Sequence, residues 1–563
     1  NTDWFNTGNW GPGTVPTATD GAYIPAGRSN YPFINAAGAT CYHLTIESGA
    51  SLSMSAATSF TLQVTGDWLN NGTFTRGIGT VAFTGTNALQ TIKGTSTSDF
   101  YILQVSKGSM DNILDAVSPI TLNATVDAPL DLLSGTFRLS NAASNITAIR
   151  ANGTLAANTI GSGKRFWVAA GTLNVNSSWR LNIGGELKIT GGTVNVGNAV
   201  NQSLDYLNFG KIVLESGTLN VSAGIWGNAS GLTSTGVMEI SGGTMNLGVF
   251  GNGSSRGMLE VNANCNFTMS GGTIVFRRGN GHTHQYYNLS SNQSVTGGTI
   301  QIGDASTPVS QTIRINSTTP VYNLTVNATN APTVQLLTND LTVKNDVTIS
   351  GGTLNANSLN LNVGGHWTND GTFTPGAGTV TFNGLANQNL AGSTATTFNN
   401  LTMNNAAGLT LSGSVNTTVN GTLNLTSGVI STGANRVIIP ASGTVTRTAG
   451  HIFGKLQKNV ATGSNVTCNF EIGDAASANY TPASLTFASV SAAGDLIAQA
   501  VSGDHPQIGS ATLNASKSVN RYWSLTNSGT SFTTCDAVFN FLTADLDPSA
   551  NTADLICGKY DAP

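Results

Sequence analysis

The sequence predicts an all-β protein built as a parallel β-helix, or β-solenoid, and three observations lead to this prediction. A short phrase of two small residues, a Thr and an apolar–polar–apolar run recurs at intervals of 21 to 29 residues through the middle of the chain. No stretch shows the sustained i, i+3, i+4, i+7 apolar spacing of a helix. A longer stretch near the start of the chain also returns later. Units of this length that repeat indicate a repeat architecture.

The recurring phrase reads as a turn followed by a strand. Its copies are Ala169–Val175, Thr190–Val196, Glu215–Val221, Ser241–Leu247, Ser270–Phe276, Thr296–Ile302 and Ser350–Ala356. Glycine adopts backbone angles that other residues avoid, and the run after it alternates with period 2 and favours β-structure. Unequal intervals are typical of a solenoid, in which strands stack while the loops between them change length. The patterns leave the handedness of the coil open.

A second repeat joins two distant parts of the chain. The stretch Val64–Gly85 matches Val363–Gly384 at a constant offset of 299 residues. The matched aromatic pairs are Trp68 with Trp367, Phe74 with Phe373 and Phe83 with Phe382. We expect these rings to stack inside the coils. Duplicated blocks near 41–130 and 340–430 would then flank the Gly-Gly-Thr coils, within a solenoid that spans residues 41–434.

The two ends of the chain differ from the repeats. Residues 1–40 contain Trp4, Trp10 and several prolines, and we expect a capping segment there because the first coil would otherwise expose an unpaired edge. The two Trp side chains are also compatible with a sugar-stacking platform. Residues 435–563 carry irregular alternating strands separated by turn residues, which predicts an antiparallel β-sandwich domain.

Composition narrows the classes of function. Only 9% of the 563 residues are charged and the net charge is −4, so the sequence predicts no nucleic-acid surface. No run of 18 apolar residues is present, so no membrane insertion is expected. Five scattered cysteines form neither a disulfide framework nor a zinc site. Cys41 and Cys265 are expected to be buried, and one disulfide among Cys468, Cys535 and Cys557 stays open. No cofactor is expected.

Several motifs resemble a known group of proteins. These are Trp10-x-x-Gly13-x-Val15-Pro16 followed by Ile24-Pro25, the Tyr-x-x-Leu-Thr units, the Gly-Gly-Thr coils and Asn520-Arg521-Tyr522-Trp523. Together they are similar to the large secreted cell-surface β-helix repeat proteins of Bacteroidota-type bacteria. This resemblance implies an extracellular or cell-surface location, export often by the type IX route, and roles in adhesion, gliding or extracellular matrix.

One stretch concentrates residues that could contact a ligand. The candidates are Arg277, Arg278, His282, His284, Tyr286 and Tyr287. His-x-His on an extended strand places two imidazoles on one face, as a metal site requires. No Asp, Glu or Cys lies between Phe267 and Asn292, so we predict no metal site. We expect a loop that leaves the solenoid, with basic and aromatic groups able to contact an acidic glycan.

The leading functional hypothesis is a secreted, non-enzymatic structural or adhesive protein: a stiff stalk, an adhesin or a filament subunit. Its expected partners are other copies of itself or surface glycans. The alternative is a polysaccharide-active lyase or hydrolase, or a glycan-binding β-helix. Hydrolysis needs two positioned carboxylates, and the pairs Asp111/Asp115 and Asp127/Asp131 do not recur on neighbouring coils, so we predict no catalytic residues. Ice binding by a threonine array is a third hypothesis, which the unequal intervals disfavour.

Overall fold

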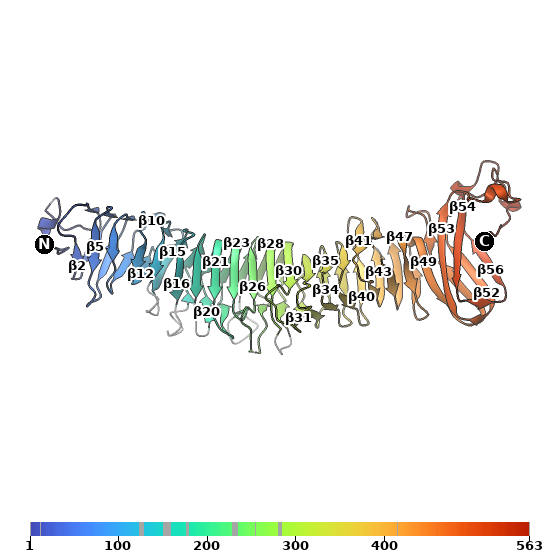
Figure 1. The fold of residues 1–563 in the computed structure, drawn as a ribbon, viewed down its shortest axis with the longest axis horizontal. Coiled ribbons are helices and arrows are strands. Elements are labelled where there is room, and N and C mark those ends of the chain that lie inside the picture. Colours follow the sequence, from blue (N-terminus) through green and yellow to red (C-terminus); the bar gives the residue numbers. More distant parts are fainter. Residues whose placement is uncertain are drawn as a thin grey trace. The chain divides into compact units, whose positions relative to one another are not determined.

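The structure is a computed structural model that describes residues 2–11, 13–122, 129–149, 159–175, 180–227, 235–253, 255–279, 284–413 and 415–561. The chain is a parallel β-solenoid of about 18 turns with 2% helix, so the predicted all-β class and parallel β-helix are confirmed (Figure 1). It divides into two compact units, Asn1–Thr319 and Pro320–Pro563. Within the described ranges no helix is long and apolar enough to span a membrane.

In the first unit each coil contributes three strands, and strands of successive coils pair in parallel on three faces. The first face contains β1 (Ala22–Ile24), β4 (Leu44–Ile46), β7 (Trp68–Asn70), β10 (Leu89–Lys93), β13 (Ile113–Ala116), β18 (Lys164–Val168) and β25 (Gly236–Ile240). The second face contains β2 (Phe33–Ile34), β5 (Ser51–Met54), β8 (Thr73–Thr75), β11 (Ser98–Phe100), β14 (Ile120–Leu122), β16 (Asn145–Ile149), β19 (Thr172–Val175) and β26 (Thr244–Leu247). The third face contains β3 (Ala39–Cys41), β6 (Thr61–Val64), β9 (Thr80–Phe83), β12 (Ile102–Ser106), β17 (Thr159–Ile160), β20 (Arg180–Ile183), β22 (Ser203–Tyr206), β24 (Ile225–Gly227), β27 (Leu259–Val261), β29 (Tyr286–Asn288) and β31 (Thr312–Ser317).

Five long strands bend around a corner and so belong to two faces. They are β15 (Leu130–Leu139), β21 (Glu186–Val196), β23 (Gly210–Val221), β28 (Asn266–Phe276) and β30 (Asn292–Ile302). In the last four strands, the bend lies at the recurring phrase. It contains Gly-Gly in β21, β28 and β30, and Ser-Gly in β23. The φ of Gly192 is +63°, and a Cβ at Gly191 would lie 2.2 Å from the carbonyl oxygen of Ala169 on the coil before. The paired glycines are therefore required both by backbone angle and by close stacking of corners.

The corner after the second strand takes up the differences in coil length. Three residues (222–224) connect β23 to β24, whereas eleven residues (248–258) connect β26 to β27. From β19 to β26 the second face keeps its register. Its asparagines form a ladder in which each Nδ2 donates to the Oδ1 of the coil before at 2.7–2.9 Å, through Asn145, Asn174, Asn195, Asn220 and Asn246. Unequal intervals between repeats thus coexist with a regular face.

The N-terminal segment is only partly as predicted. Parallel pairing already begins at β1 and β2, inside the 1–40 stretch that we expected to be a cap, because short alternating segments there continue the strands of the next coil. The capping part is shorter and includes η1 (Thr7–Asn9). Trp4 is fully buried, and its backbone N–H donates to the carbonyl of Phe33 at 3.1 Å. The ring of Trp10 lies edge-on to Trp4, with 4.8 Å between centroids. The buried Trp4 ring acts in packing and is not a sugar platform.

The second unit has the same three-face plan. Its first face contains β32 (Asn323–Val326), β35 (Val347–Ile349), β38 (Trp367–Asn369), β41 (Gln388–Ala391), β44 (Leu409–Leu411), β47 (Val429–Ile439), β49 (His451–Val460) and β51 (Ile472–Gly473). The second contains β33 (Thr333–Leu336), β36 (Thr353–Asn355), β39 (Thr372–Thr374), β42 (Thr397–Phe398) and β45 (Thr417–Val419). The third contains β34 (Leu341–Val343), β37 (Leu361–Val363), β40 (Thr379–Phe382), β43 (Asn400–Asn404), β46 (Thr422–Ser427) and β48 (Thr444–Arg447).

The duplicated aromatic residues stack inside the coils of both units, as predicted. Trp68 lies 4.8 Å from Phe74 and 5.4 Å from Phe100, measured between ring centroids. Trp367 lies 4.8 Å from Phe373 and 5.7 Å from Phe398. Both indole rings are fully buried. The two blocks therefore share one internal arrangement of rings.

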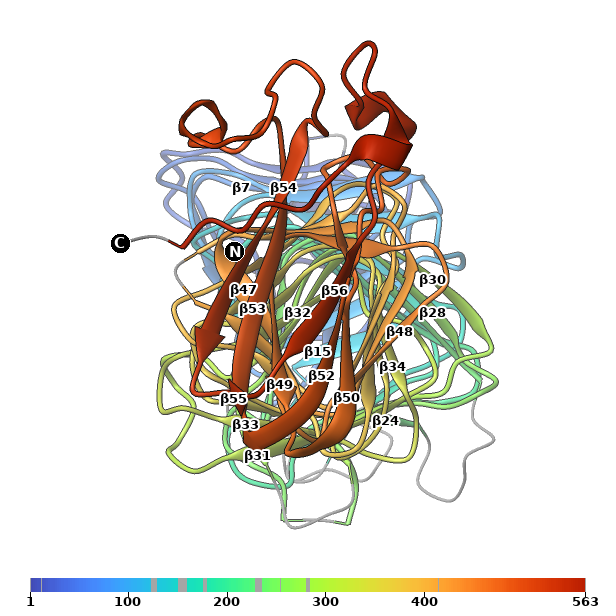
Figure 2. The ribbon, with the colours of Figure 1, turned by 90° about the vertical axis from the view of Figure 1, so that its right-hand side faces the viewer.

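The solenoid extends beyond residue 434. Parallel pairing continues through β47 to β49 and through β46 to β48, because the strands after Pro440 resume the coil. Antiparallel pairing then begins, in two sheets (Figure 2). One sheet joins β49 to β53 (Gly494–Ser502) and β54 (Arg521–Ser528), and the other joins β50 (Gly463–Phe470), β52 (Ala483–Ala492), β55 (Ser531–Phe532) and β56 (Cys535–Phe539). Short 3-10 turns, η3 (Ile508–Ser510), η4 (Thr543–Asp545) and η5 (Thr552–Asp554), connect and follow them. A β-sandwich stays a prediction.

All five cysteines are free. Cys41 and Cys265 are buried, as predicted. Burial in apolar surroundings raises the pKa of the Cys41 thiol to about 12, so this group packs as a small apolar side chain. Cys468 is also buried, whereas Cys557 is exposed, and no disulfide joins the C-terminal three.

Candidate functional site

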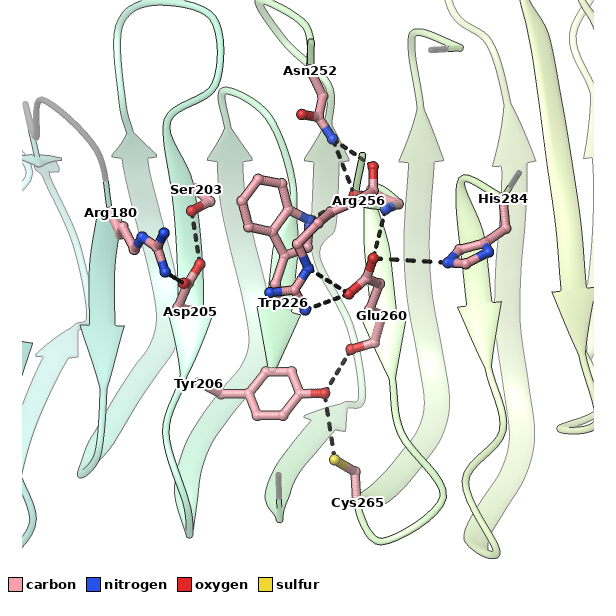
Figure 3. Close-up of polar contacts among 11 residues, drawn as sticks. Arg180, Ser203, Asp205, Tyr206, Trp226, Asn252, Arg256, Glu260, Cys265 and His284 are labelled. Carbon is pink, nitrogen blue, oxygen red and sulfur yellow. Dashed lines mark hydrogen bonds and ion pairs between the residues drawn. The ribbon is translucent and has the colours of Figure 1, made fainter. Parts of the chain in front are cut away.

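A row of polar and aromatic side chains follows the third face of the first unit across four coils. We call it the polar row, and it consists of Asp205 on β22, Trp226 on β24, Glu260 on β27 and Tyr287 on β29. Strand register sets the order, since Asp205 pairs with Trp226, and Glu260 pairs with Tyr287. Ile225 pairs with Leu259, which places Trp226 beside Glu260. Figure 3 shows Asp205, Trp226 and Glu260 with their polar partners.

Loops from the variable corner lie close to the polar row. Arg256 and Gly257 reach it from the loop 248–258, whose Gly251 carbonyl accepts from the N–H of Asn201 at 3.1 Å. Asp205 and Glu260 are therefore only 1% and 7% exposed. Burial makes an uncompensated charge expensive, so each carboxylate needs partners.

Asp205 is compensated by one cation and one hydroxyl. Arg180 Nη1 lies 3.1 Å from Asp205 Oδ2, and Ser203 Oγ donates to Oδ1 at 2.7 Å (Figure 3). Burial nevertheless raises the pKa of Asp205 above its usual value, because desolvation outweighs the help from Ser203 and from Arg180 and Arg256. This carboxyl group has an increased tendency to hold a proton.

Glu260 has more partners than Asp205, and its pKa is shifted in the opposite direction. Arg256 Nε lies 2.9 Å from Oε2, the N–H of Gly257 donates to Oε1 at 2.6 Å, and His284 Nε2 is 3.8 Å from Oε1. Burial alone would raise the pKa of Glu260, but these contacts outweigh it and the pKa falls below its usual value. Arg256 and Gly257 belong to one corner loop, and His284 to that of the next coil. Glu260 therefore anchors two loops.

Trp226 and Tyr206 complete the cluster. The guanidinium of Arg256 lies 5.1 Å from the centroid of the Trp226 ring, within cation–π range. Trp226 Nε1 donates to the carbonyl of Gly257 at 2.6 Å. The Tyr206 hydroxyl donates to the Glu260 carbonyl at 2.6 Å, and Cys265 Sγ donates to that hydroxyl at 3.4 Å (Figure 3). Arg256 thus links the aromatic and acidic parts of the row.

The residues predicted from the sequence are only partly at this site. His284 contacts Glu260, and its ring stacks on Tyr287 with 4.5 Å between centroids. The prediction that Tyr286 and Tyr287 lie in a loop is wrong. Both residues belong to β29, because their rings pack against the coil. Tyr286 is fully buried. His282 lies outside the described residues.

The two predicted arginines follow β28, at the corner that precedes β29. Arg277 Nε is 2.7 Å from Asp304 Oδ2, so its charge is already compensated by a carboxylate of the chain. The Nε of Arg278 is buried and has no hydrogen-bond partner among the described residues. Only part of the predicted basic surface is therefore free to meet an acidic ligand.

Sequence reasoning missed Asp205, Glu260, Arg180 and Arg256. Arg180 and Asp205 are 25 residues apart in sequence but lie on the adjacent strands β20 and β22. Asp205 and Glu260 are further apart in sequence but only two strands apart in space, so sequence spacing hides how close they are. His284 was judged to lack an acidic neighbour because none lies near it in sequence, yet Glu260 of the preceding coil is that neighbour. Counting from the Gly-Gly-Thr phrase would not have found it, because the corner of variable length lies between that phrase and the third face.

Comparison with known protein families, with curated proteins and with solved structures found no match. Over the described ranges no three His, Cys, Asp or Glu side chains gather as a metal site requires. The fold defines the class of the protein: it is a parallel β-solenoid repeat protein.

Proposed function

We propose that the chain is a secreted, non-enzymatic structural or adhesive protein whose coils form a stiff extracellular element. The observation that carries this proposal is the set of ladders that join each coil to the next. The asparagine ladder and the parallel backbone bonds of all three faces run in one direction along the first unit. Buried side chains stack in the same direction, so each coil stabilises its neighbours.

The chemistry of the outer surface also favours a structural role. With 9% charged residues, contacts to other molecules depend on hydroxyl and amide groups, which make many weak hydrogen bonds. At the end of the second unit, β53 pairs with β49 and continues its sheet with antiparallel strands. The parallel coil is thus closed by a different kind of sheet, which protects its edge from uncontrolled pairing.

Single-molecule pulling on the full chain tests the load-bearing role. We expect the coils to resist extension and then to unfold in steps, because the ladders must break coil by coil. Asn195→Ala and Asn220→Ala together should lower the force of the steps that belong to the first unit. A chain whose coils extend without measurable resistance would contradict the proposal. Immunogold labelling of intact producing cells tests the surface location.

Negative-stain imaging across a concentration series separates the two structural roles. Fibres of uniform width that lengthen with concentration would identify a filament subunit. Separate particles at every concentration would identify an adhesin or stalk. The same series with Val538→Lys, a change of an exposed apolar residue on β56, tests whether the C-terminal sheets make the contact between copies.

A second candidate, a polysaccharide-cleaving enzyme, is favoured by one observation in the polar row. Asp205 and Glu260 lie two strand spacings apart, about 9.5 Å along the stack, with Trp226 between them. Their pKa values are shifted in opposite directions, as in an acid and base pair. The carboxyl groups of inverting glycosidases are about 6.5–9.5 Å apart, and the spacing of these two strands is at the upper end of that range.

Release of reducing ends from a panel of plant, algal and bacterial polysaccharides tests this second candidate. Cleavage by the unmodified chain that is abolished in Asp205→Asn and Glu260→Gln would support it. Arg277→Gln, which removes an arginine that pairs with Asp304 and touches neither carboxylate, is the matched control. No cleavage of any polysaccharide, or cleavage that survives both substitutions, would exclude the polar row as the catalytic centre.

A further inference from the structure

An open groove of about 420 Å³ lies near the start of the first unit. We call it the Tyr42 groove, and its walls are Ala18, Thr19, Tyr42, Thr65, Thr84, Gly85, Thr86 and Asn87. The N-terminal segment forms one wall, and the corners of three successive coils form the others. Its volume is in the range of small-ligand sites.

Local contacts hold the walls in place. The hydroxyl of Thr65 donates to the carbonyl of Ala18 at 2.7 Å, and the N–H of Tyr42 donates to the carbonyl of Asp20 at 2.7 Å. Both bonds tie the N-terminal segment to the coil. At Gly85 a Cβ would lie 1.8 Å from the carbonyl oxygen of Thr65, so backbone packs directly on backbone at this corner. The groove is therefore formed before any ligand arrives.

The lining offers hydroxyl and amide groups but no charge. Thr86 and Asn87 are exposed, and Thr84 Oγ accepts from Gln63 Nε2 at 2.9 Å while its own O–H stays available. Tyr42 is the one aromatic residue of the lining, and its hydroxyl lies 3.5 Å from Asn87 Nδ2. Tyr supplies a rigid ring with a polar tip, and Asn supplies a donor and an acceptor side by side. A charged ligand would find no counter-ion in the lining.

The second duplicated block provides an internal comparison. There the N–H of Gly365 donates to the carbonyl of Asn345, as Gly66 donates to Tyr42 in the first block, so Asn345 stands where Tyr42 stands. The offset of 299 ends at Gly384, which is followed by Leu385 and Ala386 where Gly85 is followed by Thr86 and Asn87. The corner backbone is retained, whereas the aromatic ring and two polar groups are replaced. The side chains that line the Tyr42 groove are therefore specific to the first block, whereas the coil backbone is common to both.

We propose that the Tyr42 groove binds a neutral saccharide, with the Tyr42 ring against one sugar face and the Thr86 and Asn87 side chains bonded to its hydroxyl groups. This site rests on the proposed adhesive function and gives it a ligand class. A sugar presents C–H groups on its faces and hydroxyls at its rim, which matches one aromatic ring surrounded by uncharged donors and acceptors.

Calorimetric titration of the full chain tests the proposal with four tetrasaccharides. Maltotetraose, cellotetraose and tetra-N-acetylchitotetraose are the neutral probes, and tetragalacturonate is the charged one. We expect saturable binding of at least one neutral probe at one site per chain, and none of tetragalacturonate. Tyr42→Ala should weaken that binding by about tenfold or more, since a central aromatic contact is lost. Asn87→Ala, an exposed change that leaves the fold intact, should weaken it less.

Asn345→Ala in the second block is the matched control and should leave the affinity unchanged. Absence of binding by all three neutral probes would overturn the proposal, as would equal affinity of the unmodified chain and both groove variants. Preferred binding of tetragalacturonate would overturn the neutral class. These failures differ from failure of the structural role, because the pulling experiment does not depend on Tyr42.

Discussion

The two duplicated blocks share a core but differ in how its polar groups are partnered. In both, a buried Gln donates through Nε2 to backbone carbonyls of the preceding coil: Gln90 to Val64 at 3.1 Å and Gln388 to Val363 at 2.9 Å. Trp68 Nε1 donates to Ser98 Oγ at 2.9 Å, whereas Trp367 Nε1 has no partner among the described residues. The two blocks therefore share their ring packing but differ in the hydrogen bonding of the indole.

A second difference concerns charge. In the first block Lys107, which is fully buried, donates to Gln90 Oε1 at 2.8 Å. In the second block Asn405 Nδ2 donates to Gln388 Oε1 at 3.0 Å. The equivalent glutamine Oε1 thus accepts from an ammonium group in the first block and from an amide group in the second. Desolvation lowers the pKa of Lys107 to about 8, although Asp67 opposes this. The first block keeps a buried cation that the second shows to be dispensable for the fold.

The largest expected effect is loss of the shared ring stack. Trp68→Ala and Trp367→Ala should each destabilise their coils by about 3–5 kcal/mol, because a fully buried indole leaves a cavity. Hydrogen exchange of the strands on either side measures the local change. Thr73→Ala and Thr372→Ala, at matched exposed positions, should change exchange little. A large effect in only one block would break the equivalence of the two cores.

The next largest expected effect is a dependence of the first block's stability on pH. Between pH 8 and 10.5 the unfolded chain holds a proton on Lys107 that the folded chain has released, so stability should rise with pH in this window, by up to roughly 3 kcal/mol. Exchange of β10 and β12 amides, corrected for the intrinsic pH effect, measures it. Lys107→Asn should remove the Lys107 part of this rise and stabilise the block at pH 7. An unchanged pH profile in Lys107→Asn would contradict the assignment.

A smaller effect is expected from the acceptors of the indole. Ser98 Oγ accepts from both Trp68 and Asn70, whereas Thr396 Oγ1 accepts from Asn369 alone. Ser98→Ala should therefore cost about 1–3 kcal/mol, and Thr396→Ala less, since a buried donor without a partner is expensive. Urea unfolding followed by exchange in each block compares them. Equal losses would show that the Trp68 hydrogen bond adds nothing.

The smallest effect should come from the ion pair of the first block. Lys93 Nζ lies 2.9 Å from Asp67 Oδ2, with both side chains partly exposed. Ala391 and His366 occupy the matching positions of the second block. Lys93→Ala should cost between about 0 and 1 kcal/mol and less at high salt, since solvent screens such pairs. Thermal unfolding at two salt concentrations tests this, and a loss well above that range would mark the pair as structural.

Sequence patterns predicted the fold well because its causes are local. The period-2 strands depend only on neighbouring residues. The Gly-Gly corners and the duplicated aromatic residues could be recognised because each recurs in the sequence. Boundaries were less accurate: pairing starts at β1 and continues to β49, since short strands at both ends lack the phrase. The polar row depends on register between coils of unequal length. Asp205 and Glu260 are 55 positions apart in sequence but only two strands apart in space, which composition and spacing do not reveal.

The variable corner has a practical consequence for engineering. Inserting residues between β26 and β27 lengthens the perimeter of one coil and adds nothing to its height, since the strands on either side keep their partners. A peptide epitope or a small domain placed there would be displayed at a defined position along the ladder, while an insertion at a Gly-Gly corner would collide with the coil before it. The protein thus has display sites whose spacing is set by the distance between strands.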